Sequence, residues 1–368
     1  MSTHHRAGLG EQLPEFPWDT ILDVKQKAAS HPGGLIDLSV GTPVDSVDPS
    51  IQLALAEHAA APGYPPTQGS VELRQAIADS LERRYNIQGL NADAVLPVIG
   101  TKEAVAWLPT LLNLRGGIVV IPEIAYPTYE VAAIIAGCKV VRSDVPVDGA
   151  SLVFLNTPSN PTGRVLSAEE MRVWVDYARE TGAIIASDEC YMGLAWDEER
   201  RPVSLLDPAV SGGDNTNLLV LHSLSKTSNM ASYRVGFIAG DEKLVQELLL
   251  LRKHTGMMVP GPIQAATLTA LRDDQHETLQ RLRYANRRVT LLRALLAAGC
   301  SVEHSEAGLY LWTRREGADA RQTLDWFAQR GILVAPGDFY GPGGSQHVRV
   351  GLTASDEAIA EAAQRLSE

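Results

Sequence analysis

Short apolar segments alternate with helix-length segments through the middle of the chain, and this alternation restricts the possible folds more than any other feature. The apolar segments are rich in Val and Ile, which is typical of buried strands. They cover residues 95–99, 117–121, 139–142, 152–155, 183–187, 218–222 and 235–239. Helical patterns lie between several of them, at 102–112, 129–136 and 168–181. This alternation predicts a parallel or largely parallel sheet with helices on both faces.

The pattern changes after Asp241, where longer helical stretches begin. We expect helices at 242–254, 262–298, 319–330 and 355–366, with short strands near 301–303, 309–313 and 347–352. The whole therefore reads as an α/β protein with a large domain over residues 45–270 and a smaller α+β domain that combines residues 1–44 and 271–368. Within the large domain, Ser167 and Glu170 form a capping-box pattern, which predicts that a helix begins just after Ser167.

Composition argues against several classes of protein. The 368 residues carry 44 acidic and 32 basic side chains, a formal charge of -12 spread along the chain, which argues against nucleic acid or an anionic membrane as a partner. Residues 1–11 lack a signal-peptide pattern, and no apolar run approaches the roughly 20 residues that span a bilayer. The cysteines, Cys138, Cys190 and Cys300, lack metal-ligand spacing. We expect a cytoplasmic globular protein without a metal site.

Lys226 follows the expected strand at 218–222, within the run Ser223-Leu224-Ser225-Lys226-Thr227, and Arg234 comes shortly after it. Lysine forms a Schiff base with an aldehyde, and serine and arginine side chains bind phosphate. A lone lysine is usually a solvated surface group. After a buried strand, however, partial desolvation lowers the pKa of a lysine and suits it to Schiff-base formation and proton transfer. The combination predicts pyridoxal 5'-phosphate as a cofactor.

Three further polar clusters also follow expected strands, where open α/β sheets collect their ligands. Residues 100–102 join a strand to a helix start, so their backbone suits a phosphate, although such glycine turns are often purely steric. Asn160 lies in a proline-rich loop and would donate to a phenolate oxygen of the cofactor; a plain turn is the alternative. Asp188 would pair with a protonated pyridine nitrogen or, alternatively, cap the next helix. Tyr191 would donate to the same phenolate as Asn160.

Together, these clusters resemble the fold-type I aminotransferases of classes I and II, and the resemblance covers nearly the whole chain. Asn160, Asp188, Lys226 and Arg234 follow one another in the order and at the spacing of that family. The resemblance implies the fold of the pyridoxal-phosphate-dependent transferases of fold type I, with a mostly parallel central sheet in the large domain and a smaller α+β domain. It also implies that the substrates are small amino acids and 2-oxo acids.

The resemblance implies a role for each of these positions. Lys226, Asp188 and Tyr191 would be catalytic: Lys226 would bind the cofactor and carry the substrate proton, and Asp188 would keep the ring nitrogen protonated. The cofactor-binding residues would be Gly100, Thr101, Lys102, Tyr126, Asn160, Asp188, Tyr191, Ser223, Lys226, Arg234 and, from the neighbouring subunit of a homodimer, Tyr64. Tyr126 would stack on the ring; a core aromatic is the alternative. The substrate carboxylate would be bound by Arg349, Gly41 and Asn160.

Position 102 is lysine, where many members of the family carry a small residue. Residues 100–103 are similar to the diaminopimelate-directed members of the family, and residues 13–20 and 37–45 are similar to actinobacterial N-succinyldiaminopimelate aminotransferases. This similarity implies amino transfer from glutamate to N-succinyl-2-amino-6-oxopimelate, in lysine and diaminopimelate biosynthesis. Candidate cations for the distal carboxylate include Arg6, Lys25 and Arg314. Three alternatives stay open: a general aspartate, alanine or aromatic aminotransferase, a β-lyase with the same cofactor, and a regulatory protein that kept the fold without catalysis.

Overall fold

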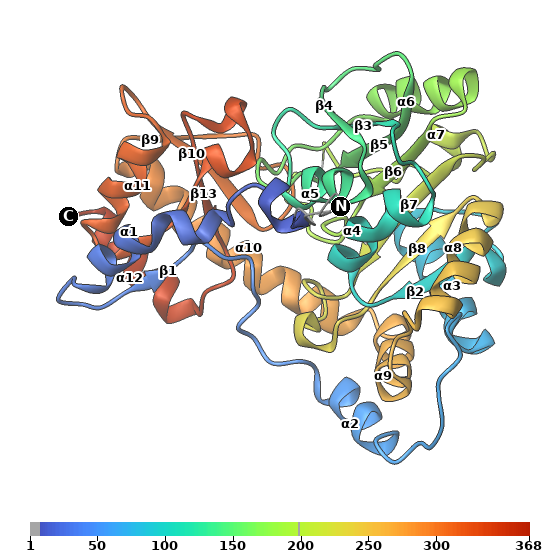
Figure 1. The fold of residues 1–368 in the computed structure, drawn as a ribbon. Helices are drawn as coiled ribbons and strands as arrows, with labels where there is room; N and C mark the ends of the chain where they lie inside the picture. The colour runs from blue at the N-terminus through green and yellow to red at the C-terminus, as the bar shows by residue number, and fades with distance from the viewer. Residues whose placement is uncertain (1–7, 198) are drawn as a thin grey trace, which may run out of the picture.

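The computed structural model describes residues 8–197 and 199–368, and within these ranges seven strands form a central sheet (Figure 1). Their order across the sheet is β2-β8-β7-β6-β5-β3-β4. They are β2 (Val95–Val98), β3 (Ile118–Ile121), β4 (Lys139–Arg142), β5 (Ala150–Asn156), β6 (Ile184–Asp188), β7 (Leu218–Ser223) and β8 (Gly236–Gly240). The strands from β4 to β7 pair in parallel, whereas β8 is antiparallel to both of its neighbours, β7 and β2. The predicted α/β fold with a mostly parallel sheet is confirmed.

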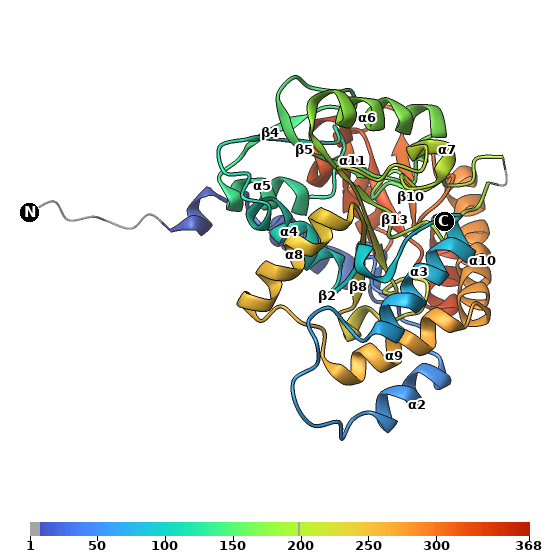
Figure 2. The ribbon, with the colours of Figure 1, turned by 90° about the vertical axis from the view of Figure 1, so that its right-hand side faces the viewer.

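Helices cover both faces of this sheet, because successive strand residues point to opposite sides. The helices of this part are α2 (Pro49–Glu57), α3 (Val71–Tyr85), α4 (Thr101–Leu111), α5 (Thr128–Ala136), α6 (Ala168–Thr181), α7 (Pro208–Ser211), α8 (Glu242–Thr255) and α9 (Gly261–Arg272). Leu219 and Leu221 of β7 belong to one buried cluster with α4, α5 and α8. Val220 belongs to a second cluster, with α3, α6 and α9. Figure 2 shows α4 and α8 on one side of β2 and β8, and α3 on the other.

A second sheet, antiparallel and four-stranded among the described residues, lies beside the first, in the order β12-β13-β10-β9. The remaining elements are α1 (Leu22–Ala29), β1 (Ile36–Asp37), α10 (Gln275–Ala297), β9 (Cys300–Glu303), β10 (Tyr310–Arg315), α11 (Ala320–Ala328), β11 (Ile332–Leu333), β12 (Ala335–Pro336), β13 (Val348–Gly351) and α12 (Asp356–Leu366). Short 3-10 turns occur at Leu9–Gln12, Pro17–Ile21, Ala92–Ala94, Ala231–Tyr233, Gly337–Tyr340 and Pro342–Gly344.

These later elements bury a hydrophobic cluster of their own, to which Leu311 of β10 and Val350 of β13 belong. The N-terminal segment crosses to the same part of the molecule, where β1 pairs in parallel with β11 (Figure 1). The division into a large domain of residues 45–270 and a small domain of residues 1–44 and 271–368 stays a prediction.

The helix expected over residues 262–298 is in fact two helices, α9 and α10, which meet at Asp273 and Asp274. Asp273 has an extended backbone, and its carboxylate accepts a hydrogen bond from the backbone N–H of Gln275 at 2.8 Å. Aspartate side chains compete for backbone N–H groups in this way, which favours helix ends over helix interiors. The predicted capping box is present, since Ser167 and Glu170 satisfy each other's backbone N–H groups at the start of α6.

None of the helices in the described ranges combines the length and the hydropathy that crossing a bilayer requires. The same ranges hold no group of three or more His, Cys, Asp or Glu side chains placed to bind a metal ion.

Candidate active site

A cavity of about 700 Å³ lies where the carboxyl ends of β5, β6 and β7 meet the start of α4 and the second sheet. Most of the predicted site residues line it: Gly41, Thr101, Lys102, Tyr126, Asn160, Asp188, Tyr191, Ser223, Lys226, Arg234 and Arg349. Two do not. Gly100 lies directly behind the cavity wall, and Tyr64, with 95% of its surface exposed, lies on a loop outside the cavity. The structure therefore brings together side chains from segments that are far apart in the sequence.

Lys226 is half-buried, and its Nζ donates a hydrogen bond to the carbonyl oxygen of Gly41. Burial lowers the pKa of Lys226. The neutral amine that this favours is the nucleophilic form of lysine. Gly41 lies so close to Tyr310 that a Cβ at this position would be 2.9 Å from the Cζ atom of that ring. Only glycine therefore lets the backbone carbonyl reach the lysine here.

Asp188 ends β6 and is 7% exposed. It accepts hydrogen bonds from the hydroxyl of Tyr129 at 2.8 Å and from the backbone N–H of Cys190 at 3.3 Å. Burial raises the pKa of this carboxyl. Asp188 does not cap a helix, because residues 190–193 form a turn. No Lys or Arg among the described residues pairs with it, so the buried carboxylate fits a cationic group of a ligand, such as a protonated pyridine nitrogen.

The start of α4 and Arg234 together form a cradle for an anion. The backbone N–H groups of the first turn of α4 point out of the helix, as they do at any helix N-terminus. Among the described residues, Arg234 has one hydrogen-bond partner, the carbonyl oxygen of Ala231 at 2.9 Å. A Cβ on Gly100, whose φ is +79°, would collide with the Arg234 guanidinium. The exposed Lys102 adds a second cation, so the set fits a phosphate.

Arg349, on β13, is a buried guanidinium that lines the cavity. It donates to Asn160 Oδ1 at 2.8 Å and to the carbonyl oxygen of Ser39 at 2.5 Å, and its carbon Cζ lies 4.0 Å from the centre of the Tyr310 ring. None of the partners recorded for it in the described ranges is a carboxylate. A buried cation with neutral partners fits a carboxylate ligand, because such a ligand would complete its charge pairing.

Three functional residues were not predicted from the sequence. Tyr129 follows Tyr126 by three residues at the start of a helical pattern, so a helical-face argument would have found it. Asn156 ends β5 beside Asp188 and donates to the backbone carbonyl of Asp188 at 3.0 Å. Tyr310 gives no local signal, because it occupies an ordinary apolar strand pattern.

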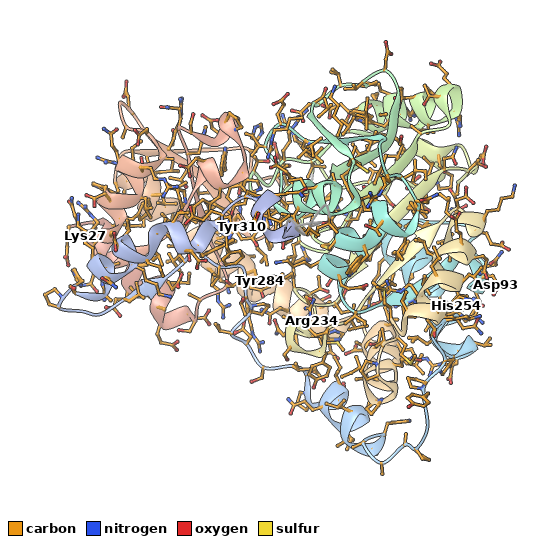
Figure 3. The ribbon with its side chains drawn as sticks, in the orientation of Figure 1. Lys27, Asp93, Arg234, His254, Tyr284 and Tyr310 are labelled. Carbon is orange, nitrogen blue, oxygen red and sulfur yellow. The ribbon has the colours of Figure 1, made fainter. Side chains whose placement is uncertain are left out.

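Tyr310 lies where the two parts of the molecule meet (Figure 3), and its hydroxyl lies 3.3 Å from that of Tyr191. Burial raises the pKa of Tyr310, but the charges of Arg349 and Lys226 outweigh it, so its pKa is lower than usual. Burial instead holds the pKa of Tyr191 well above its ordinary value. Tyr310 is therefore the better acceptor of this pair of hydroxyls.

The cations predicted for a distal carboxylate lie elsewhere. Lys25 is 3.9 Å from Asp37, and Arg314 is 2.8 Å from Glu303, and neither lines the cavity. Arg6 lies outside the described residues. The outer wall of the cavity is instead aromatic, with the rings of Phe16 and Trp18 5.7 Å apart.

Comparison with known proteins agrees with this geometry. The family model for aminotransferase class I and II matches residues 34–366. The chain is 58% identical to a probable aminotransferase of Mycobacterium tuberculosis, over 98% of this chain and 87% of that protein. It is 50% identical to the 4-dedimethylamino-4-oxo-anhydrotetracycline transaminase OxyQ of Streptomyces rimosus, over 97% and 99%. It is 30% identical to the LL-diaminopimelate aminotransferase of Aquifex aeolicus, over 96% of each chain.

A crystal structure of an aminotransferase from Neisseria meningitidis superposes with a TM-score of 0.90 at 30% identity, covering 97% of this chain and 98% of that one. Both the sequence matches and the superposition extend over almost the whole molecule, and the range of the family model includes every charged residue that lines the cavity. The chain belongs to the class I and II aminotransferases, a family of pyridoxal-phosphate-dependent enzymes.

Proposed function

We propose that this aminotransferase transfers the amino group of glutamate to N-succinyl-2-amino-6-oxopimelate, a step in diaminopimelate and lysine biosynthesis. The observation that carries the proposal is the placement of buried Arg349 in the same cavity as Lys226, because it supplies a carboxylate-binding cation beside the reactive amine. The 30% identity to an LL-diaminopimelate aminotransferase supports a diaminopimelate-related acceptor.

Pyridoxal phosphate supplies an aldehyde and an electron-accepting ring when it is bound. We propose that Lys226 would hold the cofactor through its Nζ and that this Nζ, once displaced by the amino group of the substrate, would carry the proton of the substrate α-carbon. Asp188 would pair with the ring nitrogen, Asn160 and Tyr191 would donate to the ring oxygen, and Tyr126 would stack on the ring. The phosphate would be bound by Gly100, Thr101, Lys102, Ser223 and Arg234.

Arg349 orients the substrate through its carboxylate, with Gly41 and Asn160 beside it. The planar guanidinium makes two parallel hydrogen bonds to a carboxylate, which restricts how the substrate can rotate. Asn160 Oδ1 already accepts from Arg349 at 2.8 Å, and this bond supports the orientation of the guanidinium.

We further propose a homodimer with shared active sites, in which Tyr64 reaches the phosphate of the neighbouring subunit. The support is its position: the ring is 95% exposed, and exposed apolar side chains such as Leu53 and Val71 lie on the flanking helices. The cytoplasmic location stays a prediction.

A second candidate acceptor is a larger cyclic ketone. The 50% identity to the Streptomyces rimosus transaminase favours it, because that protein is named for a tetracycline intermediate. The aromatic wall of Phe16 and Trp18 would suit such a planar substrate.

A panel of acceptors with glutamate as donor would separate these possibilities, with release of 2-oxoglutarate as the readout. It should contain N-succinyl-2-amino-6-oxopimelate, oxaloacetate, pyruvate, phenylpyruvate and the tetracycline ketone. We expect the highest kcat/KM for the succinylated acceptor. Turnover of another acceptor, together with no turnover of the succinylated one, would refute the substrate assignment and leave the aminotransferase assignment standing. Pyruvate and ammonia released from a single amino acid would indicate a β-lyase, and a protein that takes up cofactor without any turnover would indicate a regulatory role.

A further inference from the structure

The first turns of α10 contact two separate segments of the active site. One is the loop 227–229, which directly follows Lys226. The other is the segment 41–45, which begins at the glycine that accepts a hydrogen bond from Lys226. Figure 1 shows α10 extending from its junction with α9 to the second sheet, so the helix joins the two parts of the molecule.

Glu277 and His276 bind the two hydroxyl side chains that follow Lys226. Glu277 Oε1 accepts hydrogen bonds from Thr227 Oγ1 at 2.8 Å and from Ser228 Oγ at 3.4 Å. The Nε2 atom of His276 lies 2.8 Å from Ser228 Oγ. The loop is therefore attached to α10 by its side chains.

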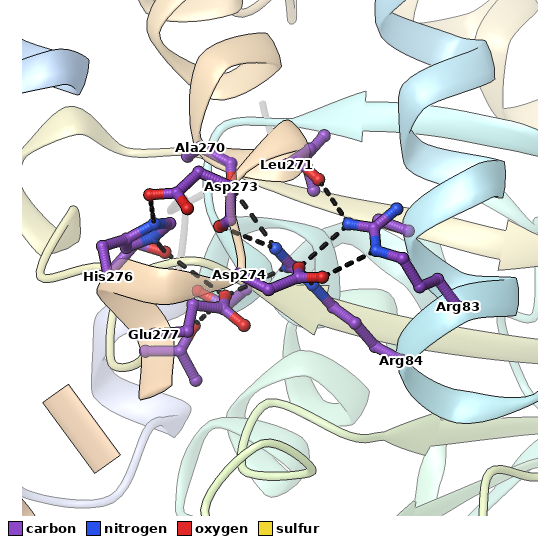
Figure 4. A network of polar contacts seen from close by, with 12 residues as sticks. Arg83, Arg84, Ala270, Leu271, Asp273, Asp274, His276 and Glu277 are labelled. Carbon is purple, nitrogen blue, oxygen red and sulfur yellow. Dashed lines mark hydrogen bonds and ion pairs between the residues drawn. The ribbon is translucent and has the colours of Figure 1, made fainter. Parts of the chain in front are cut away.

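This end of α10 is itself fixed to α3, as Figure 4 shows. Arg84 lies 3.1 Å from Glu277, and its Nε donates to Asp274 at 2.6 Å. Arg83 donates to the same carboxylate at 2.7 Å, and these hydrogen bonds hold the pKa of Asp274 well below its usual range. Because the Asp274 carboxylate stays ionised and bonded to both arginines, the N-terminal turn of α10 is a fixed support for the loop.

Gln280, one turn further along α10, connects the two segments through a single side-chain amide. Its Oε1 accepts from Asn229 Nδ2 at 2.9 Å and from Arg283 at 3.1 Å. Its Nε2 donates to Asp45 Oδ2 at 2.7 Å. The side chain is 2% exposed, so these hydrogen bonds are shielded from water.

Asp45 is held from a second direction by Arg287, which donates to both of its oxygens at 2.7 and 2.8 Å. Arg287 also donates to Asp356, at the start of α12, at 2.6 Å. The segment 41–45 is thus tied to α10 at its far end and to Lys226 at Gly41.

Lys226 is therefore held at both ends, by the segment 41–45 and by the loop 227–229, and both of these bond to the side-chain amide of Gln280. Its tip bonds to Gly41, and its backbone continues into the loop that Asn229 anchors. We propose that Gln280 is a positioning residue for the reaction: it sets the spacing between the Lys226 loop and the segment 41–45, and so the place of Lys226 Nζ in the cavity. The inference rests on the cofactor role of Lys226 under the proposed function.

Gln280→Glu tests this with almost no change in shape, because it replaces the donor to Asp45 by an oxygen that repels it. We expect kcat to fall by about 10- to 100-fold, the range for a misplaced catalytic group, with the KM for glutamate kept. The pKa read from the visible absorption of the lysine-bound cofactor should shift as well. Gln329→Glu is the matched control, since the exposed Gln329, just past the end of α11, donates to Asp325 at 2.9 Å.

A reversal of the bond gives a second test. In the double variant Gln280→Glu with Asp45→Asn, the carboxylate and the amide exchange places, so the net charge is unchanged and the bond can form in the opposite direction. Asp45→Asn by itself also removes an acceptor of Arg287, so this variant is measured alone as well. We expect the loss of kcat in the double variant to be smaller than the product of the two single losses, a coupling that independent effects would not produce.

Three results would overturn the proposal: an unchanged spectroscopic pKa and kcat in Gln280→Glu, the same loss in Gln329→Glu, or a loss in the double variant equal to the product of the two single losses. A crystal structure of Gln280→Glu gives a readout without cofactor, and a Lys226–Gly41 hydrogen bond kept in place would also contradict it. A visible band of the lysine-bound cofactor that survives in the Lys226→Ala variant would instead contradict the proposed role of Lys226. The two failures are therefore distinguishable.

Discussion

At the scale of single residues, burial moves the pKa values of the two central groups in opposite directions. The pKa of Asp188 is raised and that of Lys226 is lowered, in both cases chiefly because burial disfavours the charged form. The cavity thus holds an acid and a base whose pKa values are both shifted toward neutral pH, which suits groups that exchange protons with a ligand.

Lys226→Ala should remove the visible absorption band of the lysine-bound cofactor and lower kcat by at least about 1000-fold, within the range for loss of a general base. Lys253→Ala, an exposed lysine in the last turn of α8, is the control. Absorption spectra and steady-state rates of both variants measure the effect. Normal transamination by the Lys226 variant would disprove the assigned role.

Tyr129→Phe should shift the acidic limb of the pH profile of kcat/KM to higher pH. The phenol of Tyr129 donates to Asp188 at 2.8 Å and favours the carboxylate, so its loss raises the already elevated pKa of Asp188 further. A group with a raised pKa protonates earlier as the pH falls, so activity should be lost sooner on acidification. A hydrogen bond to a charged group is worth about 1.5–3 kcal/mol, or roughly one to two pKa units.

Tyr177→Phe is the control for this substitution, because its hydroxyl donates to the carbonyl oxygen of Val147, at 2.6 Å, away from the cavity. A pH profile of the Tyr129 variant that overlays the wild-type profile would show that the bond does not set the ionisation of Asp188.

At the scale of elements, the strands of the central sheet are predicted from the sequence to within about two residues, because continuous Val and Ile runs are typical of strands buried on both faces. The two-residue strands β1, β11 and β12 are missed, since their pairing depends on partners distant in the chain. The break between α9 and α10 is also missed. Residues 272–278 are all polar, so no apolar residue marks where α9 ends and α10 begins. The decisive contacts of Asp274 are with Arg83 and Arg84 of α3.

Ser167→Ala should destabilise the protein by about 1 kcal/mol, because it removes the capping hydrogen bond to the Glu170 backbone at 3.2 Å. The midpoint of thermal unfolding, compared at equal protein and cofactor concentration, measures this loss. Activity at 25 °C should stay unchanged, since α6 contributes no residue to the cavity. A wild-type midpoint would mean that the cap is not formed in solution.

At the scale of the whole molecule, the role proposed for the exposed Tyr64 requires a second subunit beside it. A mixture of Tyr64→Ala and Lys226→Ala subunits tests this. In a mixed dimer, one site would combine Lys226 from the first subunit with Tyr64 from the second and would be wild type in composition. We expect activity to rise well above the sum of the separate variants after dissociation and reassociation. Strictly additive activity would show that Tyr64 does not serve a neighbouring site.

The sequence by itself determined the sheet, the family and the order of Asn160, Asp188, Lys226 and Arg234. These follow from local patterns, because strands that run in parallel bring their carboxyl ends to one edge, so residues that follow them meet there. It could also name Arg349 and Gly41, but only through the resemblance to a family.

Only the tertiary structure decided how these residues are supported. Arg349 bonds to Ser39 across a separation of 310 residues, and Gln280 joins Asn229 to Asp45. No local pattern encodes such contacts, since the partners are far apart in the sequence and several of them lie in loops. The same holds for the raised pKa of Asp188, because it depends on burial, and burial exists only once distant segments have packed together. The lowered pKa of Lys226 was expected from its place after a buried strand, and the structure confirms the direction.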